Sequence, residues 1–495
     1  MVARASALSR PAPGVRSAPA SLVVRLTFIV LLVACPLLPV FRNSVQSYPA
    51  VAHFWVVLPF CGLFLLPLID FEHLRRMLHL DLLVLLSFAV ALGTWSHART
   101  WPMLFVYAPL AYLGVRMVRI ARVGGHDSPG RSETPLALSL PRSWLIAGIV
   151  VLVGVHASWT LDSQVSTDVG PGSVQGAQRI LHGRSLYGVD RSLLSSLGYD
   201  PHYDTYGPVD YEAYVPFAGV ASSETAARLA ALFFDLLTAA LLLALGRQVR
   251  GPTVGIVLAY AWLAFPFTLY ADGLAANDSM VAAALVGALL LAGAPLRRGA
   301  MAAVLAWTKL TPLALVPVLA GHNPSGKGRR RQLLAFGAAF GLASAVVFVP
   351  ALTHGSPGEF MARTFGFQIS RDPGYSIWER IDSGAPLGAV AGVRAVSGVA
   401  HGLLIALTGG FAVALLWLPK RQDVIGLAGA SAAVLIAVLA CDGYYSFTYI
   451  LWFAPLVVVA LVLESGEIAE RRTRTVGSPA QEMTVSSLGS PVSTS

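Results

Sequence analysis

The long apolar runs of this sequence restrict its fold more than any other feature. A helix of about 20 apolar residues is long enough to cross the hydrocarbon core of a bilayer. Only 12% of the 495 residues are charged, against roughly 25% in a soluble domain. The sequence therefore predicts an all-α polytopic membrane protein. The runs lie at 22–40, 51–69, 80–97, 102–118, 143–159, 225–246, 252–271, 278–293, 299–320, 332–352, 396–417, 424–441 and 447–464.

The rest of the composition excludes several other classes of protein. The net charge of +9 is explained by arginines in cytoplasmic loops, where Lys and Arg are enriched, so we expect no nucleic acid as a partner. The cysteines Cys35, Cys61 and Cys441 lack the spacing of a zinc site or a disulfide framework. We expect the first run to remain as a helix, because no clear small-residue cleavage site accompanies it.

The distribution of Lys and Arg predicts the orientation of the chain, because cytoplasmic loops carry an excess of these residues. If both termini are cytoplasmic, the segments 160–223 and 353–385 face the outside. We expect the protein in the cytoplasmic membrane. The basic clusters that then lie inside are residues 75–76, 116–131, 247–250, 327–331, 420–421 and 471–474.

The run 299–320 is the exception to this pattern. Arg297 and Arg298 precede it and the basic cluster 327–331 follows it, so both of its ends belong in the cytoplasm. Pro312 removes a backbone hydrogen bond near its centre. We therefore expect two half-helices that form a re-entrant pair, with its tip near residues 308–311, because broken backbone is tolerated where it lines a cavity. The predicted fold then has about twelve transmembrane helices plus this pair.

On this interpretation the chain divides into four parts. Residues 1–20 and 465–495 are expected to be disordered cytoplasmic tails, because they are rich in charged or small polar residues. Residues 21–142 would form four accessory transmembrane helices. Residues 143–464 would form the transmembrane core, with 160–223 as its long first outer loop.

The outer segments contain acidic and aromatic residues that the topology does not explain. The segment 160–223 holds seven acidic residues and six tyrosines. Aromatic faces stack on sugar rings, and carboxylates accept hydrogen bonds from hydroxyl groups, so this set indicates a carbohydrate site. The alternative interpretation is an interfacial aromatic belt with solvated loop charges.

Four stretches of the core resemble a known group of membrane enzymes. They are Asp168 with the following GAQRILHGRSLYG (176–188), YDTYGPVDYEAYVPF (203–217), AWTKLTPLALVP (306–317) and DGYYSFTYILWFAPL (442–456). Together they resemble the GT-C-fold glycosyltransferases that use polyprenyl-phosphate-linked sugars, most of all glycosyltransferase family 87. The resemblance covers the core, and the four helices before it are additional to the commonest pattern of the group.

The resemblance implies a function. A hexose, with mannose expected, would move from a polyprenyl-phosphate-linked donor to a lipid or glycan acceptor on the outer face of the membrane. A single displacement would invert the anomeric centre. Membrane lipids are the other expected partners. No nucleotide-binding domain is visible, which fits a reaction on the side where nucleotide sugars are not supplied.

This reaction needs a base for the acceptor and a group that holds the phosphate. We expect Asp168 as the base, since it matches the acidic residue of the resemblance, with Asp162 as the second candidate. A helix N-cap is the structural alternative for Asp168. We expect Lys309 to bind the phosphate, with pairing to a buried acid as its alternative. The other expected substrate-binding residues are Arg179, His202, Asp204, Tyr206, Asp210, Asn277, Asp278, Arg371, Arg380, Tyr444 and Tyr445.

The residues alone leave other functions open. A lipid or polysaccharide transporter or flippase also uses broken helices, although the chain shows no convincing internal repeat. A lipid-linked-glycan ligase or polymerase also has large outer loops. For a glycosyltransferase, Asp168 and Lys309 should converge on one cavity. No cofactor or metal site is predicted, although Asp168 with Asp278 leaves a divalent ion open.

The predicted topology can be tested by labelling from outside the cell. A membrane-impermeant thiol reagent should reach the substituted cysteine of Ser196→Cys and of Ser356→Cys in intact cells, because both positions lie in predicted outer segments. If these positions are labelled only after the membrane is opened, the predicted orientation is the wrong way round. The argument for a lipid-linked donor on the outer face would then also fail.

Overall fold

The computed structural model describes residues 16–17, 22–37, 54–71, 74–94, 101–123, 137–163, 166–187, 204–324, 326, 328–371, 374–382, 393–417 and 421–476. Within these ranges the chain is helical, which confirms the expected all-α class. The exception is a short parallel pairing of β1 (Arg16–Ser17) with β2 (Ala137–Leu138). His202 and the predicted tails outside these ranges lie beyond the described residues.

Many of the apolar runs form helices that can cross a membrane. The described residues contain seven such stretches of helix, which confirms a polytopic membrane protein. The stretches are α4 (Met77–Thr94), Leu104–Arg122 in α5 (Tyr107–Val123) and the turn before it, α6 (Arg142–Leu161), α11 (Ser223–Arg250), α17 (Arg329–Thr353), α22 (Val424–Cys441) and Phe447–Ser465, which includes most of α23 (Ile450–Val476). Other helices have shorter apolar stretches, among them α1 (Leu22–Ala34), α3 (Phe54–Leu65), α14 (Asp278–Leu290) and the part Gly398–Ala414 of α21 (Val393–Ala414).

The apolar run 252–271 is not one straight helix, because a proline divides it, although its two helices together are long and apolar enough for one broken span. Helix α12 (Pro252–Leu263) and helix α13 (Pro266–Gly273) are bent by 50° at the break between them. Phe265 has an extended backbone, with φ −74° and ψ 125°. The residue before a proline is driven out of the helical region by a clash with the proline ring, so the bend follows from Pro266.

The segment 295–320 is also broken, at the place that the sequence indicates. Helix α15 (Pro295–Ala306) ends before the predicted tip, and a 3₁₀ turn η5 (Thr311–Leu315) leads into α16 (Val316–Ala320). The side chain of Arg298 is fully buried and donates hydrogen bonds to the carbonyl oxygens of Leu319 and His322, at 2.9 and 2.7 Å. The start of α15 and the end of α16 therefore lie side by side.

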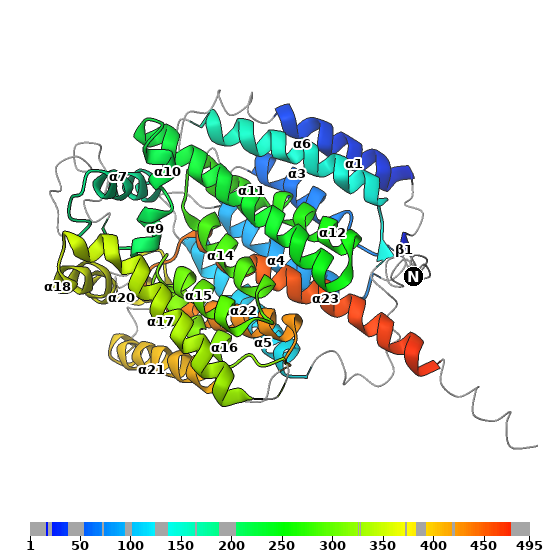
Figure 1. The fold of residues 1–495 in the computed structure, drawn as a ribbon. Coiled ribbons are helices and arrows are strands. Elements are labelled where there is room, and N and C mark those ends of the chain that lie inside the picture. The colour runs from blue at the N-terminus through cyan, green and yellow to red at the C-terminus, as the bar shows by residue number, and fades with distance from the viewer. Residues whose placement is uncertain are drawn as a thin grey trace, which may run out of the picture.

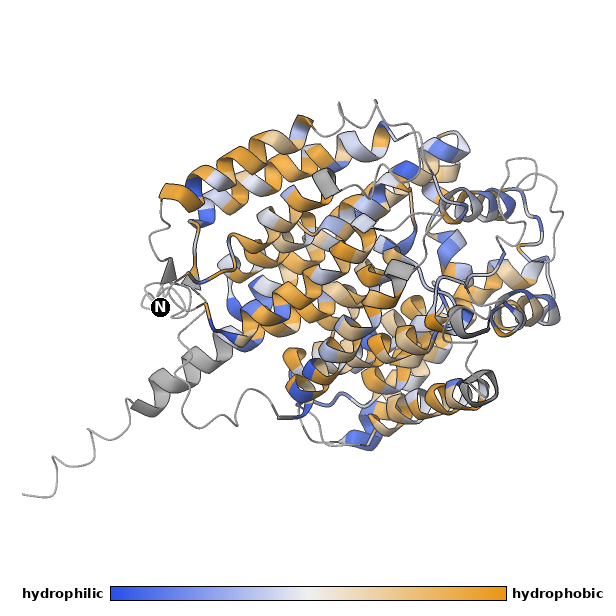
Figure 2. Cartoon of the chain, turned by 180° about the vertical axis from the view of Figure 1, so that it is seen from behind, coloured by the Kyte–Doolittle hydropathy of each residue, from blue (hydrophilic) through white to orange (hydrophobic). Residues whose placement is uncertain are grey.

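The short helices gather at one end of the bundle (Figure 1). The short strand β1 and the last turns of α23 lie at the opposite end. Apolar residues dominate the long helices, whereas polar residues are frequent in the short ones (Figure 2). Parts of the two predicted outer segments thus share one end of the molecule. The short helices are α7 (Val169–Leu181), α9 (Pro208–Glu212), α10 (Val215–Ala218), α18 (Pro357–Met361) and α20 (Ile377–Asp382).

The last helix forms the centre of the bundle. In the apolar stretch that includes most of α23, 94% of the residues are buried, against 6% in α17, so α17 presents its apolar side chains to the surroundings. Helix α23 continues to Val476, so residues 465–476 are helical where a disordered tail is expected. The helices packed around α23 therefore hold its first turns in place, directly after the turn at residues 442–446.

Candidate active site

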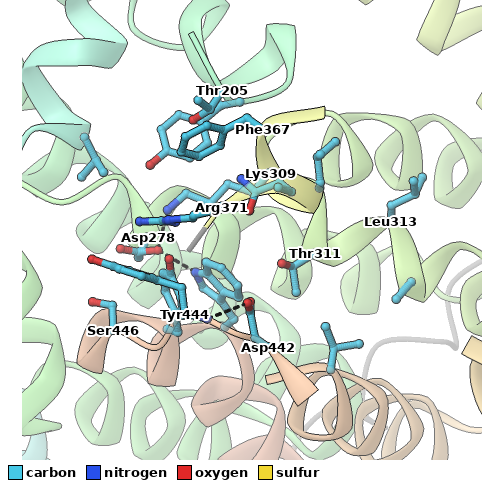
Figure 3. A pocket seen from close by; sticks show the side chains of 18 of the residues that line it. Thr205, Asp278, Lys309, Thr311, Leu313, Phe367, Arg371, Asp442, Tyr444 and Ser446 are labelled. Carbon is cyan, nitrogen blue, oxygen red and sulfur yellow. Dashed lines mark hydrogen bonds and ion pairs between the residues drawn. The ribbon is translucent and has the colours of Figure 1, made fainter. Parts of the chain in front are cut away.

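A cavity of about 690 Å³ lies where the broken segments meet. Its wall is formed by the start of α7, the start of α14, the turn 309–314, the segment 365–371 and the turn that leads into α23. Asp278, Lys309, Arg371, Asp442 and Tyr444 point into it (Figure 3). The cavity therefore carries charged and polar side chains at the breaks between helices.

A close contact between two turns positions Lys309. The backbone N–H of Gly207 donates to the carbonyl of Thr308 at 3.1 Å, and the N–H of Val209 donates to Trp307 at 3.1 Å. A Cβ atom at Gly207 would lie 2.0 Å from the Trp307 carbonyl oxygen, so only glycine allows this approach. The contact places the ring of Tyr206 5.1 Å from the ammonium of Lys309.

The ammonium of Lys309 pairs with a buried carboxylate. Its Nζ lies 2.7 Å from Oδ1 of Asp278, which also accepts the indole N–H of Trp452 at 2.7 Å. The Trp452 ring lies 5.2 Å from Nζ. A buried lysine needs such a partner, because a lone charge is costly away from water. Lys309 therefore pairs with a buried acid, which is the alternative that the sequence left open. It also lines the cavity.

Arg371 is the second cation of the cavity. Its guanidinium carbon lies 3.4 Å from the centre of the Tyr444 ring, a cation–π contact. The N–H of Gly374 donates to Gly443 at 2.9 Å, and the N–H of Tyr445 donates to Gly374 at 3.0 Å, so the two segments are held together. Among the described residues, no carboxylate lies within ion-pair distance of Arg371.

Two further carboxylates line the cavity. Asp168 is partly exposed at the N-cap position of α7, but its side chain makes no capping hydrogen bond, which argues against the capping alternative. The N–H of Thr167 donates to Leu274 at 2.9 Å and fixes the turn before it. Burial raises the pKa of Asp442, although the N–H of Tyr444 and the charge of Arg371 oppose the shift.

Asp210 and Asn277 lie behind the cavity instead of in its wall. Oδ1 of Asp210 accepts the side-chain N–H of Asn277 at 2.8 Å, and Oδ2 accepts the hydroxyl of Ser173 at 2.6 Å. Burial raises the pKa of Asp210 to about 7, although these two donors and Lys309 favour its charged form. The network connects α7, α9 and the turn before α14, so it supports the cavity wall.

Four of the other predicted site residues, all of them described, are not in the cavity wall. Asp162 is exposed at the end of α6, where it accepts the hydroxyl of Ser158 at 3.2 Å. Arg179 donates to the carbonyl of Ser185 at 2.5 Å. Asp204 is buried and lies 3.4 Å from Arg363. Tyr445 is buried beneath the turn. Arg380 lies in α20, and its side chain is outside the described residues.

The structure also adds residues that the sequence did not single out. Asp442, Tyr449 and Trp452 line the cavity, and the rings of Tyr449 and Trp452 stack with their centres 4.2 Å apart. All three lie in the stretch 442–456, which the resemblance had marked as a whole. These residues are far from Lys309 in the sequence, so their contacts around the cavity cannot be inferred from the sequence alone.

The comparison with known families agrees with the resemblance. Residues 205–441 match the sequence model of glycosyltransferase family 87. Asp278, Lys309 and Arg371 lie inside the matched part, Asp442 and Tyr444 follow its end, and Asp168 lies well before its start. No curated protein matches the sequence. The expected family is thereby confirmed over residues 205–441. Most of the residues that line the cavity lie in this part of the chain.

The Lys309–Asp278 pair should be needed for stability. Lys309→Met leaves a buried carboxylate without its partner and should cost about 3–5 kcal/mol. The double variant Lys309→Met/Asp278→Asn should lose much less, because the amide oxygen still accepts from Trp452 and no charge remains. Unfolding of the purified protein by heat and by denaturant measures both. A double variant that loses as much stability as Lys309→Met or more would contradict the expected effect of the unpaired carboxylate.

Proposed function

We propose that this protein, which is a glycosyltransferase, transfers a hexose from a polyprenyl-phosphate donor to a lipid or glycan acceptor on the outer face of the cytoplasmic membrane. Mannose is the proposed sugar. One observation carries the proposal: Asp168, Lys309 and Arg371 come from three distant parts of the chain and line the same cavity. A base and two cations are the groups that sugar transfer from a phosphate requires.

Asp168 is the proposed base. Its carboxylate takes the proton of the acceptor hydroxyl as the acceptor oxygen bonds to the anomeric carbon. The bond from that carbon to the phosphate oxygen breaks, and the electron pair leaves with polyprenyl phosphate. The transition state has oxocarbenium character, and one displacement inverts the anomeric centre. No acid is required, because the phosphate leaves as an anion.

Arg371 is the better candidate for the phosphate. The charge of Lys309 is already balanced by Asp278 at 2.7 Å, whereas Arg371 has no such partner among the described residues. A planar guanidinium also matches phosphate oxygens in a bidentate way. Lys309 then adds a hydrogen-bond donor near the leaving group, and its contact at 2.7 Å holds the side chain of Asp278 in place.

The lining of the cavity fits an amphipathic donor. One part is polar, with Asp168, Arg371 and Asp442, and it holds the reacting groups. Another part is apolar and comes from η5, α16, α21 and α22. A polyprenyl chain would bury its apolar surface there while the phosphate stays beside Arg371. The apolar residues are Leu310, Leu313, Ala314, Pro317, Ala412, Val413 and Val438.

The contacts of Arg298 support the proposed re-entrant pair. The guanidinium at the start of α15 bonds to carbonyl groups at the end of α16, so the two ends of the segment are close together. A straight span of 20 residues would separate its ends by about 30 Å. The tip with Lys309 then lies at the cavity, and the basic residues on both sides of the segment stay in the cytoplasm.

The re-entrant pair predicts the location of two reporters. A topology reporter fused after Arg298 and a second one fused after Gly321 should both be cytoplasmic, because the segment between them does not cross the membrane. A pair fused after Arg250 and after Asp278 serves as a control for a segment that does cross. Reporters on opposite sides for the first pair would establish a continuous span instead.

Asp168→Asn should remove sugar transfer without loss of the fold. Asparagine keeps the size of the side chain but cannot accept the proton, and general-base catalysis contributes about 10²–10⁴-fold. The measurement is kcat for transfer of radiolabelled mannose from polyprenyl-phosphate-mannose by purified protein at saturating donor, since a change in KM alone indicates binding.

Asp162→Asn is the matched control, because this exposed acid lies in the same segment but outside the cavity wall. It should keep transfer near the wild-type rate. Asp442→Asn distinguishes the two cavity acids. If Asp168→Asn stays active while Asp442→Asn loses activity, Asp442 is the base. If both stay active, the cavity is not the catalytic site.

A further inference from the structure

A second polar cluster lies inside the bundle, apart from the cavity wall. It consists of His156 from α6, Asp235 from α11 and Asp272 from α13, and all three side chains are fully buried. Their ligand atoms lie within 4.8 Å of one another. The proposed reaction does not use these residues. Two acids and a histidine from three helices are therefore held together away from water without an assigned role.

Hydrogen bonds within the cluster leave carboxylate oxygens without partners. Nδ1 of His156 lies 2.7 Å from Oδ2 of Asp272 and 3.2 Å from Oδ2 of Asp235. One ring nitrogen can donate only one proton, and Oδ2 of Asp235 makes no hydrogen bond. Oδ1 of Asp272 also has no hydrogen-bond partner. Each of the two buried carboxylates thus has one oxygen that accepts no hydrogen bond, and Oδ2 of both acids faces the same ring nitrogen.

The charge of the cluster is also unbalanced. Two carboxylates with a neutral imidazole carry a charge of −2, and with an imidazolium they carry −1. Buried charges without a partner are costly. A divalent cation bound by two carboxylates and a neutral imidazole brings the total to zero. No Lys or Arg among the described residues lies within ion-pair distance of either acid.

The surrounding hydrogen bonds have the pattern of a metal site. Nε2 of His156 lies 2.9 Å from the carbonyl oxygen of Leu263, so Nε2 carries a proton. In a neutral imidazole Nδ1 would then be unprotonated, and it would bind an ion in place of its present contact with Oδ2 of Asp272. Metal-bound histidines usually donate their other ring N–H to such an acceptor. The indole N–H of Trp262 donates to Oδ1 of Asp235 at 2.7 Å, which leaves Oδ2 directed at the centre.

We infer that His156, Asp235 and Asp272 bind a divalent transition-metal ion such as zinc. The donor set of one imidazole and two carboxylates suits zinc, and ligand atoms of a tetrahedral zinc site lie roughly 3.4 Å apart. The ion joins α6, α11 and α13. Since α13 leads directly into Leu274 and Asp278 of the cavity wall, the site holds one wall of the cavity in position.

The test is the metal content of the full-length protein, purified in detergent without chelator. Elemental analysis by mass spectrometry should find about one transition-metal ion per chain in the wild type. His156→Gln and Asp272→Asn should each fall below about a tenth of an ion per chain. A chelator should lower the melting temperature of the wild type and leave that of the two variants unchanged.

His79→Gln is the matched control. His79 is a buried histidine on α4 whose ring nitrogens form hydrogen bonds with the backbone of Leu74 and Asp70, so this variant should keep its ion. A metal-free wild type whose melting temperature does not rise with added zinc or manganese would overturn the proposal. The charge of the cluster would then be reduced by protons shared among the three side chains instead of by a metal ion. Full metal content in His156→Gln would also overturn it. If the variants do not fold, the wild-type content and its chelator response decide.

Discussion

The buried ion pair of Lys309 and Asp278 is the interaction on which the cavity depends. It joins a helix break to the first turn of α14, and the indole of Trp452 adds a third helix through the same carboxylate oxygen. A charge can remain in an apolar bundle only when such a partner is present. The pair thus lets charged side chains remain beside a cavity that is lined in part by apolar residues.

The cavity unites two kinds of surface that a lipid-linked sugar donor needs. Its polar part brings together carboxylates, a guanidinium and aromatic rings, and its apolar part is formed by helices that pack around α22. Under the proposed function, the base and the phosphate-binding group come from segments before and after the broken helix. The hydrogen bonds between Gly207 and Thr308, and between Gly374 and Gly443, set the distance between those segments. The backbone of the turns therefore determines the geometry of the site.

Local features of the sequence predict part of this arrangement. Apolar run length indicates the helices, and Pro312 with its flanking arginines indicates a break near Lys309, where α15 ends. The acid before α7 lies in the cavity as expected. By contrast, the bend at Pro266 was missed, because prolines are tolerated in many membrane helices. The pairing of Lys309 with Asp278, and the cluster of His156 with two acids from other helices, depend on contacts between distant residues. Spacing along the chain does not encode these contacts.

The identity of the donor is the central claim, and one measurement tests it directly. Purified protein in lipid nanodiscs is incubated in parallel with radiolabelled polyprenyl-phosphate-mannose and with radiolabelled nucleotide-linked mannose, in the presence of a membrane lipid extract as the source of acceptor. The account predicts labelled product from the lipid-linked donor and none from the nucleotide sugar. Product from the nucleotide sugar alone would contradict the proposed donor and the role given to the apolar part of the cavity.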